Sequence, residues 1–187
     1  MLGPLSVFHW SNIPTVLNER QWLSGCNISF RRELLEATGG FPEALGRRGE
    51  SLLGGEEIYL RRQLDARGET TVYNPFAAVG HYISPHKLNK EWFKRAAFNQ
   101  GLSDARMLQL DGGLPLASRV IRILGSIAWA APRGLLMLKA RDDAARFLRL
   151  CQLLQAAGLI SGLLKVGPIP VTPVSLPDRS MVSRKAT

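Results

Sequence analysis

The chain has 187 residues, of which 45% are hydrophobic, so it can form one domain with a real core and is too apolar to be disordered throughout. Its formal charge of +9 is uneven: residues 1–113 carry 13 basic and 12 acidic side chains, whereas residues 114–187 carry 11 and 3. The basic second part predicts an anionic partner, and we expect a membrane surface and no nucleic acid, because no helix-turn-helix, zinc or RNA-binding signature occurs. Two distant cysteines exclude a disulfide framework and favour a reducing compartment, and the N-terminus does not have the pattern of a signal peptide.

The first part of the chain alternates between short strand and helix patterns, which favours half of an α/β sandwich. Glycines, prolines and asparagines separate these patterns. In chain order we expect an irregular lead-in over 1–24, a strand over 25–30, a helix over 31–38, a helix from Glu56 to about Arg67, strands over 69–73 and 77–83, and a helix from about Asn89 to about Asn99.

The stretch from Gly54 to Gly68 holds the candidate chemistry. Two glycines precede the adjacent Glu56 and Glu57, and a short helix with apolar positions at Leu60 and Leu64 follows. Unpaired N–H groups and the macrodipole favour negative charge at a helix start, and glycine lets a ligand approach the backbone. The pair is therefore either an ordinary acidic helix start or a general base at the mouth of a cleft.

The second part of the chain consists of two apolar runs, 114–140 and 147–167, separated by Arg141-Asp-Asp. Arginines and Pro132 interrupt the first run, and the second is short for a membrane span. Helices that lie in the membrane interface fit this pattern, with a packed helical hairpin in a soluble core as the alternative. The last twenty residues, 168–187, contain four prolines and predict a flexible tail.

Six short motifs occur in a fixed order over about residues 23–106. They are Gly-Cys-Asn-Ile-Ser-Phe-Arg-Arg-Glu at 25–33, Gly-Gly-Phe-Pro-Glu at 39–43, Gly-Glu-Glu at 55–57, Arg-Gly at 67–68, Asn-Pro at 74–75 and His81. This series resembles the family-2 glycosyltransferases and is similar to the acceptor-side half of their GT-A catalytic domain. The resemblance implies an α/β fold, a partial Rossmann-like GT-A half-domain with a mixed sheet. The expected organisation is a lead-in (1–24), this half-domain (25–113), basic apolar membrane-associated helices (114–167) and a flexible tail (168–187).

The resemblance implies an enzyme that transfers a sugar from a nucleotide-sugar donor to an acceptor hydroxyl by inverting displacement. The general base falls by position on Glu57, although the family usually has Asp there. Glu56 and Gly55 would then bind the acceptor, a glycan or lipid-linked molecule, with stabilisation of the turn as the alternative role of Glu56. Adjacent carboxylates also raise each other's proton affinity, which suits a base.

Three further residues take roles from the same resemblance. His81 would help to coordinate a divalent metal, Mn²⁺ or Mg²⁺, with a hydrogen-bonded loop histidine as the equal alternative. Arg95 and Gln100 match an Arg-x-x-x-x-Gln-Gly element and would meet the donor pyrophosphate or the acceptor, unless they simply form a solvated helix face.

The family's nucleotide-binding half, with its Asp-x-Asp motif, has no counterpart before Gly25. We therefore expect a truncated gene product, a fragment, or half of a split enzyme whose partner is a separate donor-binding half. The expected location is the cytoplasmic side of a membrane. The alternative from another functional class is a catalytically silent module, derived from a glycosyltransferase, that binds a membrane or a protein partner.

Overall fold

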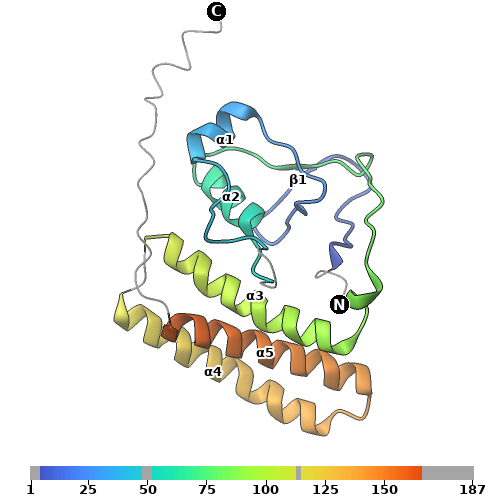
Figure 1. The fold of residues 1–187 in the computed structure, drawn as a ribbon, viewed down its shortest axis with the longest axis vertical. Helices are drawn as coiled ribbons and strands as arrows, with labels where there is room; N and C mark the ends of the chain where they lie inside the picture. The colour runs from blue at the N-terminus through green and yellow to red at the C-terminus, as the bar shows by residue number, and fades with distance from the viewer. Residues whose placement is uncertain (1–4, 48–51, 113–114, 166–187) are drawn as a thin grey trace, which may run out of the picture.

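The computed structural model describes residues 5–47, 52–112 and 115–165, so the predicted flexible tail lies outside the described residues. The described part is mainly helical, with a small two-stranded sheet (Figure 1). Its elements are β1 (Thr15–Val16), α1 (Arg32–Thr38), α2 (Glu56–Asp65), β2 (Val72–Tyr73), the 3₁₀ helix η2 (Pro85–Lys87), α3 (Lys90–Leu110), α4 (Leu116–Lys139) and α5 (Asp143–Lys165).

The predicted end of α1 and the predicted start of α3 are confirmed, and a capping residue lies at each. Gly39, with φ of 77°, caps α1 in the left-handed conformation. Asn89 caps α3, because its side chain accepts a hydrogen bond of 2.9 Å from the N–H of Trp92. However, α3 continues to Leu110, well beyond the predicted end near Asn99. The second half of α3 packs against α5, a stabilisation that the local sequence pattern does not show.

The strand predictions are only partly confirmed. β2 lies within the predicted strand 69–73 and pairs antiparallel with β1 of the lead-in, with Val16 opposite Val72. Residues 25–30 and 77–83 form no strand, and a side-chain bond from Asn27 to the carbonyl of Ala77 joins these two runs instead of a ladder. A strand needs a partner of matching register, which neither run has among the described residues. The α/β half-domain with a mixed sheet stays a prediction.

The three long helices form a layer in which α5 lies between α3 and α4 (Figure 1). Small residues one turn apart let the backbones of α3 and α5 touch, since a Cβ on Gly101 would lie 2.0 Å from the carbonyl oxygen of Gln155, and one on Gly158 2.0 Å from that of Phe98. Helix α3 belongs to the expected half-domain (25–113), and α5 belongs to the expected C-terminal helices (114–167). These two regions therefore pack together along the length of α3.

Helix α2 rests on this layer through a small core of Leu45, Tyr59 and Met107, with Ile58 and Leu110 beside it. The other side of α2 is tied to the lead-in by the buried Arg61. Its guanidinium donates to the backbone carbonyls of Leu17, Asn18 and Gln21 and pairs with Asp65 at 3.3 Å. The start of α2 is therefore held from two sides.

Candidate functional site

The loop before α2 is fixed to α3 by its two glycines. The N–H of Gly54 donates a 3.0 Å hydrogen bond to the hydroxyl of Ser103, which is buried in α3. Gly55 has φ of 91°, a left-handed conformation that favours glycine, and a Cβ there would lie 3.4 Å from the sulfur of Met107. These contacts set the position of Glu56 and Glu57, the first residues of α2.

Glu57 is half-buried, and its carboxylate faces the backbone of Gly25, where a Cβ would lie 3.8 Å from Oε1. Burial raises the pKa of Glu57 above its ordinary value of 4.5, and the charge of Glu56 adds to this effect. The backbone N–H groups of Glu57 itself and of Gly25, together with Arg47, lower the pKa by less. Burial therefore outweighs the helix start, which alone would favour the charged form.

Glu56 is also half-buried, and its Oε2 is shielded from solvent without a hydrogen-bond partner among the described residues. Its carboxylate lies against two further glycines, since a Cβ would come within 3.7 Å of it at Gly46 and 3.9 Å at Gly54. Both carboxylates therefore lie directly against glycine backbone, Glu57 at Gly25 and Glu56 at Gly46 and Gly54, where no side chain separates them from the main chain.

Arg95 and Gln100 lie on the exposed surface of α3. The Gln100 amide donates to Asp104 at 3.1 Å, and the carbonyl of Arg95 accepts from the side chain of Asn99. In residues 5–47, 52–112 and 115–165, no hydrogen bond or ion pair joins Arg95 or Gln100 to Glu57. Their contacts with a donor or an acceptor stay predictions.

His81 is exposed, and its Nδ1 lies 3.0 Å from the carbonyl oxygen of Leu5. One ring nitrogen is thus engaged by backbone, which leaves Nε2 for another contact. The part of the chain that the structure describes contains no group of three or more His, Cys, Asp or Glu side chains arranged to hold a metal ion. The role of His81 as a metal ligand stays a prediction.

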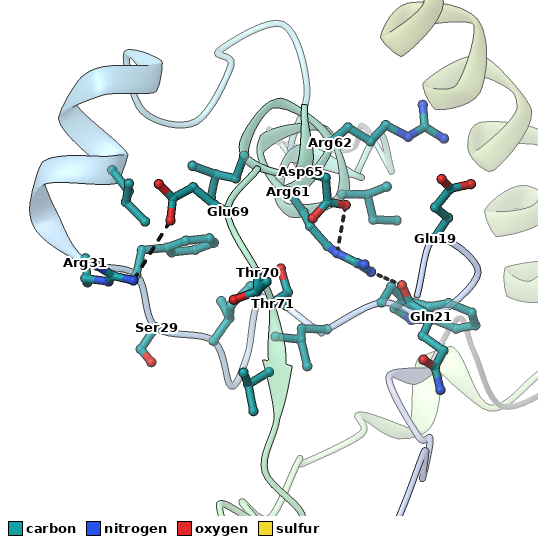
Figure 2. Close-up of a pocket in the computed structure, with 18 of the residues that line it drawn as sticks. Glu19, Gln21, Ser29, Arg31, Arg61, Arg62, Asp65, Glu69, Thr70 and Thr71 are labelled. Atoms are coloured by element: carbon teal, nitrogen blue, oxygen red, sulfur yellow. Dashed lines mark hydrogen bonds and ion pairs between the residues drawn. The ribbon is translucent and has the colours of Figure 1, made fainter. Parts of the chain in front are cut away.

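A cavity of about 750 Å³ opens on the side of α2 that faces the lead-in (Figure 2). Ile58 and Arg61 line it, whereas Glu56 and Glu57 do not. Figure 2 shows Arg31 pointing to Glu69 at 3.9 Å on one side of this cavity, and Arg61 bound to Asp65 on another. The sequence did not indicate this cavity, because its walls come from segments between residues 19 and 72 that only folding brings together.

Comparison with known proteins indicates the class of chemistry: part of the chain is similar to a glycosyltransferase. Over 80 residues it is 31% identical to a glucosyl-dolichyl phosphate glucuronosyltransferase of Haloferax volcanii. The match covers 42% of this chain and 26% of the relative, so the chain spans about a quarter of that protein's length. Neither a known protein family nor a solved structure matches the chain.

Two described helices are long and apolar enough to cross a membrane, α4 over Leu116–Lys139 and α5 over Asp143–Leu164. None of the described residues of α4 is buried, whereas α5 buries part of its length against α3. Both helices are consistent with association of the chain with a membrane.

Proposed function

We propose that this chain forms the acceptor side of a family-2, GT-A-type glycosyltransferase that works at a membrane surface. It would transfer a sugar from a nucleotide-sugar to a hydroxyl of a lipid-linked or glycan acceptor. The observation that carries this proposal is the half-buried carboxylate of Glu57, whose pKa is raised and which lies against the backbone of Gly25, at the start of a helix whose preceding loop is fixed to α3. The similarity to a glycosyltransferase supports the same chemistry.

In the proposed reaction, the acceptor oxygen attacks the anomeric carbon of the donor while Glu57 takes the hydroxyl proton. The bond from the anomeric carbon to the diphosphate breaks, the nucleoside diphosphate leaves with the bonding electrons, and the configuration inverts. A raised pKa makes the carboxylate a stronger base for this step. Glu56, beside Gly55, would bind a second hydroxyl of the acceptor, which requires its carboxylate to turn out of the position in which Oε2 is shielded from solvent.

The proposal assigns to this chain only the part of the reaction that its described residues can perform. We propose that a separate donor-binding half holds the nucleotide-sugar, with Arg95 and Gln100 of α3 reaching the diphosphate. A single imidazole nitrogen of His81 is too small a donor set to hold Mn²⁺ or Mg²⁺ by itself, so the proton transfer to Glu57 is proposed without a metal ion at His81.

The proposed location is the cytoplasmic side of a membrane. Cys26 and Cys151 are both free thiols, which agrees with a reducing compartment. The exposed apolar surface of α4 supports membrane contact whether or not the chain catalyses a reaction. That surface therefore also supports the second candidate, a catalytically silent membrane-binding module.

Glycosyl transfer can be tested with the full chain, alone and together with a supplied donor-binding polypeptide. The assay would use uridine, guanosine and thymidine diphosphate sugars, Mn²⁺ or Mg²⁺, and dolichyl-phosphate-linked sugars as acceptors. We expect Glu57→Gln to lower kcat by about 10²–10⁴-fold with little change in acceptor KM, because the amide cannot accept the proton. Glu56→Gln is the matched control, and it should mainly raise acceptor KM.

Near-normal kcat in Glu57→Gln would contradict the role of Glu57 as base and leave the pair as an ordinary helix start. A wild-type chain that is inactive on the whole panel, even with the donor-binding polypeptide, would favour the silent module. Calorimetry tests whether the donor site lies outside this chain. The chain alone should bind nucleotide-sugars weakly or not at all, and micromolar affinity would contradict a separate donor site.

A further inference from the structure

The apolar side of helix α4 faces away from the protein. Six residues on one side of α4 form what we call the outer stripe, and they are 46–76% exposed: Val120, Ile121, Leu124, Ile127, Leu135 and Leu138. The less exposed side, which packs on α5, has the heptad spacing of a helix seam and includes two arginines: Arg119, Ile123, Ser126, Ala130, Arg133 and Met137. An amphipathic helix of a water-soluble protein has the reverse arrangement.

The outer stripe contains no charged side chain, yet the helix around it is strongly basic. Residues 115–141 carry five basic side chains and no acidic one. Arg133 is folded back along the helix, with its guanidinium 3.6 Å from the centre of the Trp129 ring and its Nη1 donating to the Trp129 carbonyl. Lys139 and Arg141 are exposed at the end of α4, beyond most of the stripe, where they can reach lipid phosphates.

The neighbouring helices exclude the simplest alternative, a hairpin of α4 and α5 that spans the bilayer. The backbone contacts of Gly101 and Gly158 join α5 to α3, and Gln155 of α5 donates to Asp104 of α3 at 3.0 Å. Helix α3 has charged residues from end to end, namely Lys90, Glu91, Lys94, Arg95, Asp104 and Arg106. If α5 crossed the hydrocarbon core with α3 attached, these charges would enter it, at a cost of several kcal/mol.

We propose that α4 lies flat in one leaflet of a lipid bilayer with anionic head groups, with its outer stripe among the acyl chains and α5 and α3 above it on the aqueous side. Trp129 and the basic side chains then lie at the level of the head groups, where such residues are stabilised. This placement rests on the membrane association in the proposed function and does not depend on glycosyl transfer.

The first experiment measures binding of the full chain to vesicles of phosphatidylcholine mixed with phosphatidylglycerol. Leu124→Gln combined with Leu135→Gln should weaken binding at least about tenfold, because two leucines no longer gain from burial in the acyl chains. The matched control, Phe76→Gln with Val79→Gln, replaces two apolar side chains outside α4 that are at least as exposed as Leu135, and it should bind like wild type. Equal binding by the outer-stripe variant would overturn the proposal.

The second experiment measures the depth of the helix in the same vesicles. Nitroxide labels are placed on single cysteines at positions 120, 127 and 135, in a chain with Cys26→Ser and Cys151→Ala, and their accessibility to oxygen and to a water-soluble nickel complex is compared.

A helix in the membrane plane gives the same shallow depth at all three positions. A depth that is greatest at position 127 would show a spanning helix. Labels that are buried by dimerisation without lipid, as seen by sedimentation, would show that a second copy of the chain covers the stripe. Either result overturns the proposal, and none of these readouts uses enzymatic activity.

Discussion

At the start of α2 a carboxylate is half-buried, whereas on α4 a row of Leu, Ile and Val side chains lies in contact with solvent. In most proteins charged side chains lie at the surface and large apolar side chains lie inside, and each of these two regions reverses one half of that rule. Removing a charge from water costs free energy at α2, and leaving apolar surface in water does so at α4. Such departures mark places where a molecule outside the chain is expected to complete the environment, an acceptor hydroxyl at Glu57 and acyl chains at the outer stripe.

The layer of α3 and α5 lies between these two regions and supports both. Ser103 and Met107 of α3 hold the loop before α2, and α5 holds α4 on its other side (Figure 1). The comparison can therefore be tested by damaging the shared layer, then the site loop alone, and then the single charge.

The largest effect is expected at the contact between α3 and α5. Gly158→Ala should lower the free energy of unfolding by about 3 kcal/mol, because the new Cβ would lie 2.0 Å from the carbonyl oxygen of Phe98 and force the helices apart. The control is Gly134→Ala on α4, where a Cβ would meet nothing within 4 Å. This substitution should stabilise the helix by about 0.5–1 kcal/mol, because alanine favours the helical conformation more than glycine does. Chemical denaturation measures both. Equal effects would mean that α3 and α5 do not touch through this glycine.

A smaller effect is expected in the loop before α2. Gly55→Ala should destabilise the chain by about 1–3 kcal/mol, because φ of 91° strains any residue with a Cβ and the methyl group would press on Met107. Vesicle binding through α4 should remain unchanged. A variant that lost vesicle binding in the folded state would show that the two regions are coupled, against the comparison.

The smallest effect concerns the charge of Glu57. Burial raises the pKa of Glu57 above 4.5 in the folded chain, so stability falls as pH rises through that raised pKa and the carboxylate ionises. Glu57→Gln should therefore have a higher melting temperature than wild type near neutral pH. The difference should vanish at about pH 3, well below the ordinary pKa of 4.5, where Glu57 is protonated in both the folded and the unfolded chain. Thermal denaturation at both pH values measures this. A variant less stable than wild type at neutral pH would mean that the carboxylate stabilises the fold.

The sequence by itself determined the features that depend on neighbouring residues. The acidic pair opening a helix after two glycines, the cap at Asn89 and the two long apolar helices were all predicted, because capping and helical periodicity act within a few residues. The resemblance to a glycosyltransferase was inferred from short local motifs, and the 31% identity over 80 residues to one such enzyme supports it in part. The roles of Glu57, His81, Arg95 and Gln100 stay predictions.

Only the tertiary structure decided which of two similar apolar helices is inside. Helices α4 and α5 both satisfy the length and composition of a membrane span, but the small residues Gly158 and Gly162 let α5 approach α3, while α4 keeps its apolar side outward. The structure also extended α3 to Leu110 and left residues 25–30 and 77–83 without strands. The burial that raises the pKa of Glu57 was equally invisible, since it arises from packing in the folded chain, which also brings Gly25, far away in sequence, against the carboxylate. Packing and burial are set by distances between segments, and a linear pattern of residues does not contain those distances.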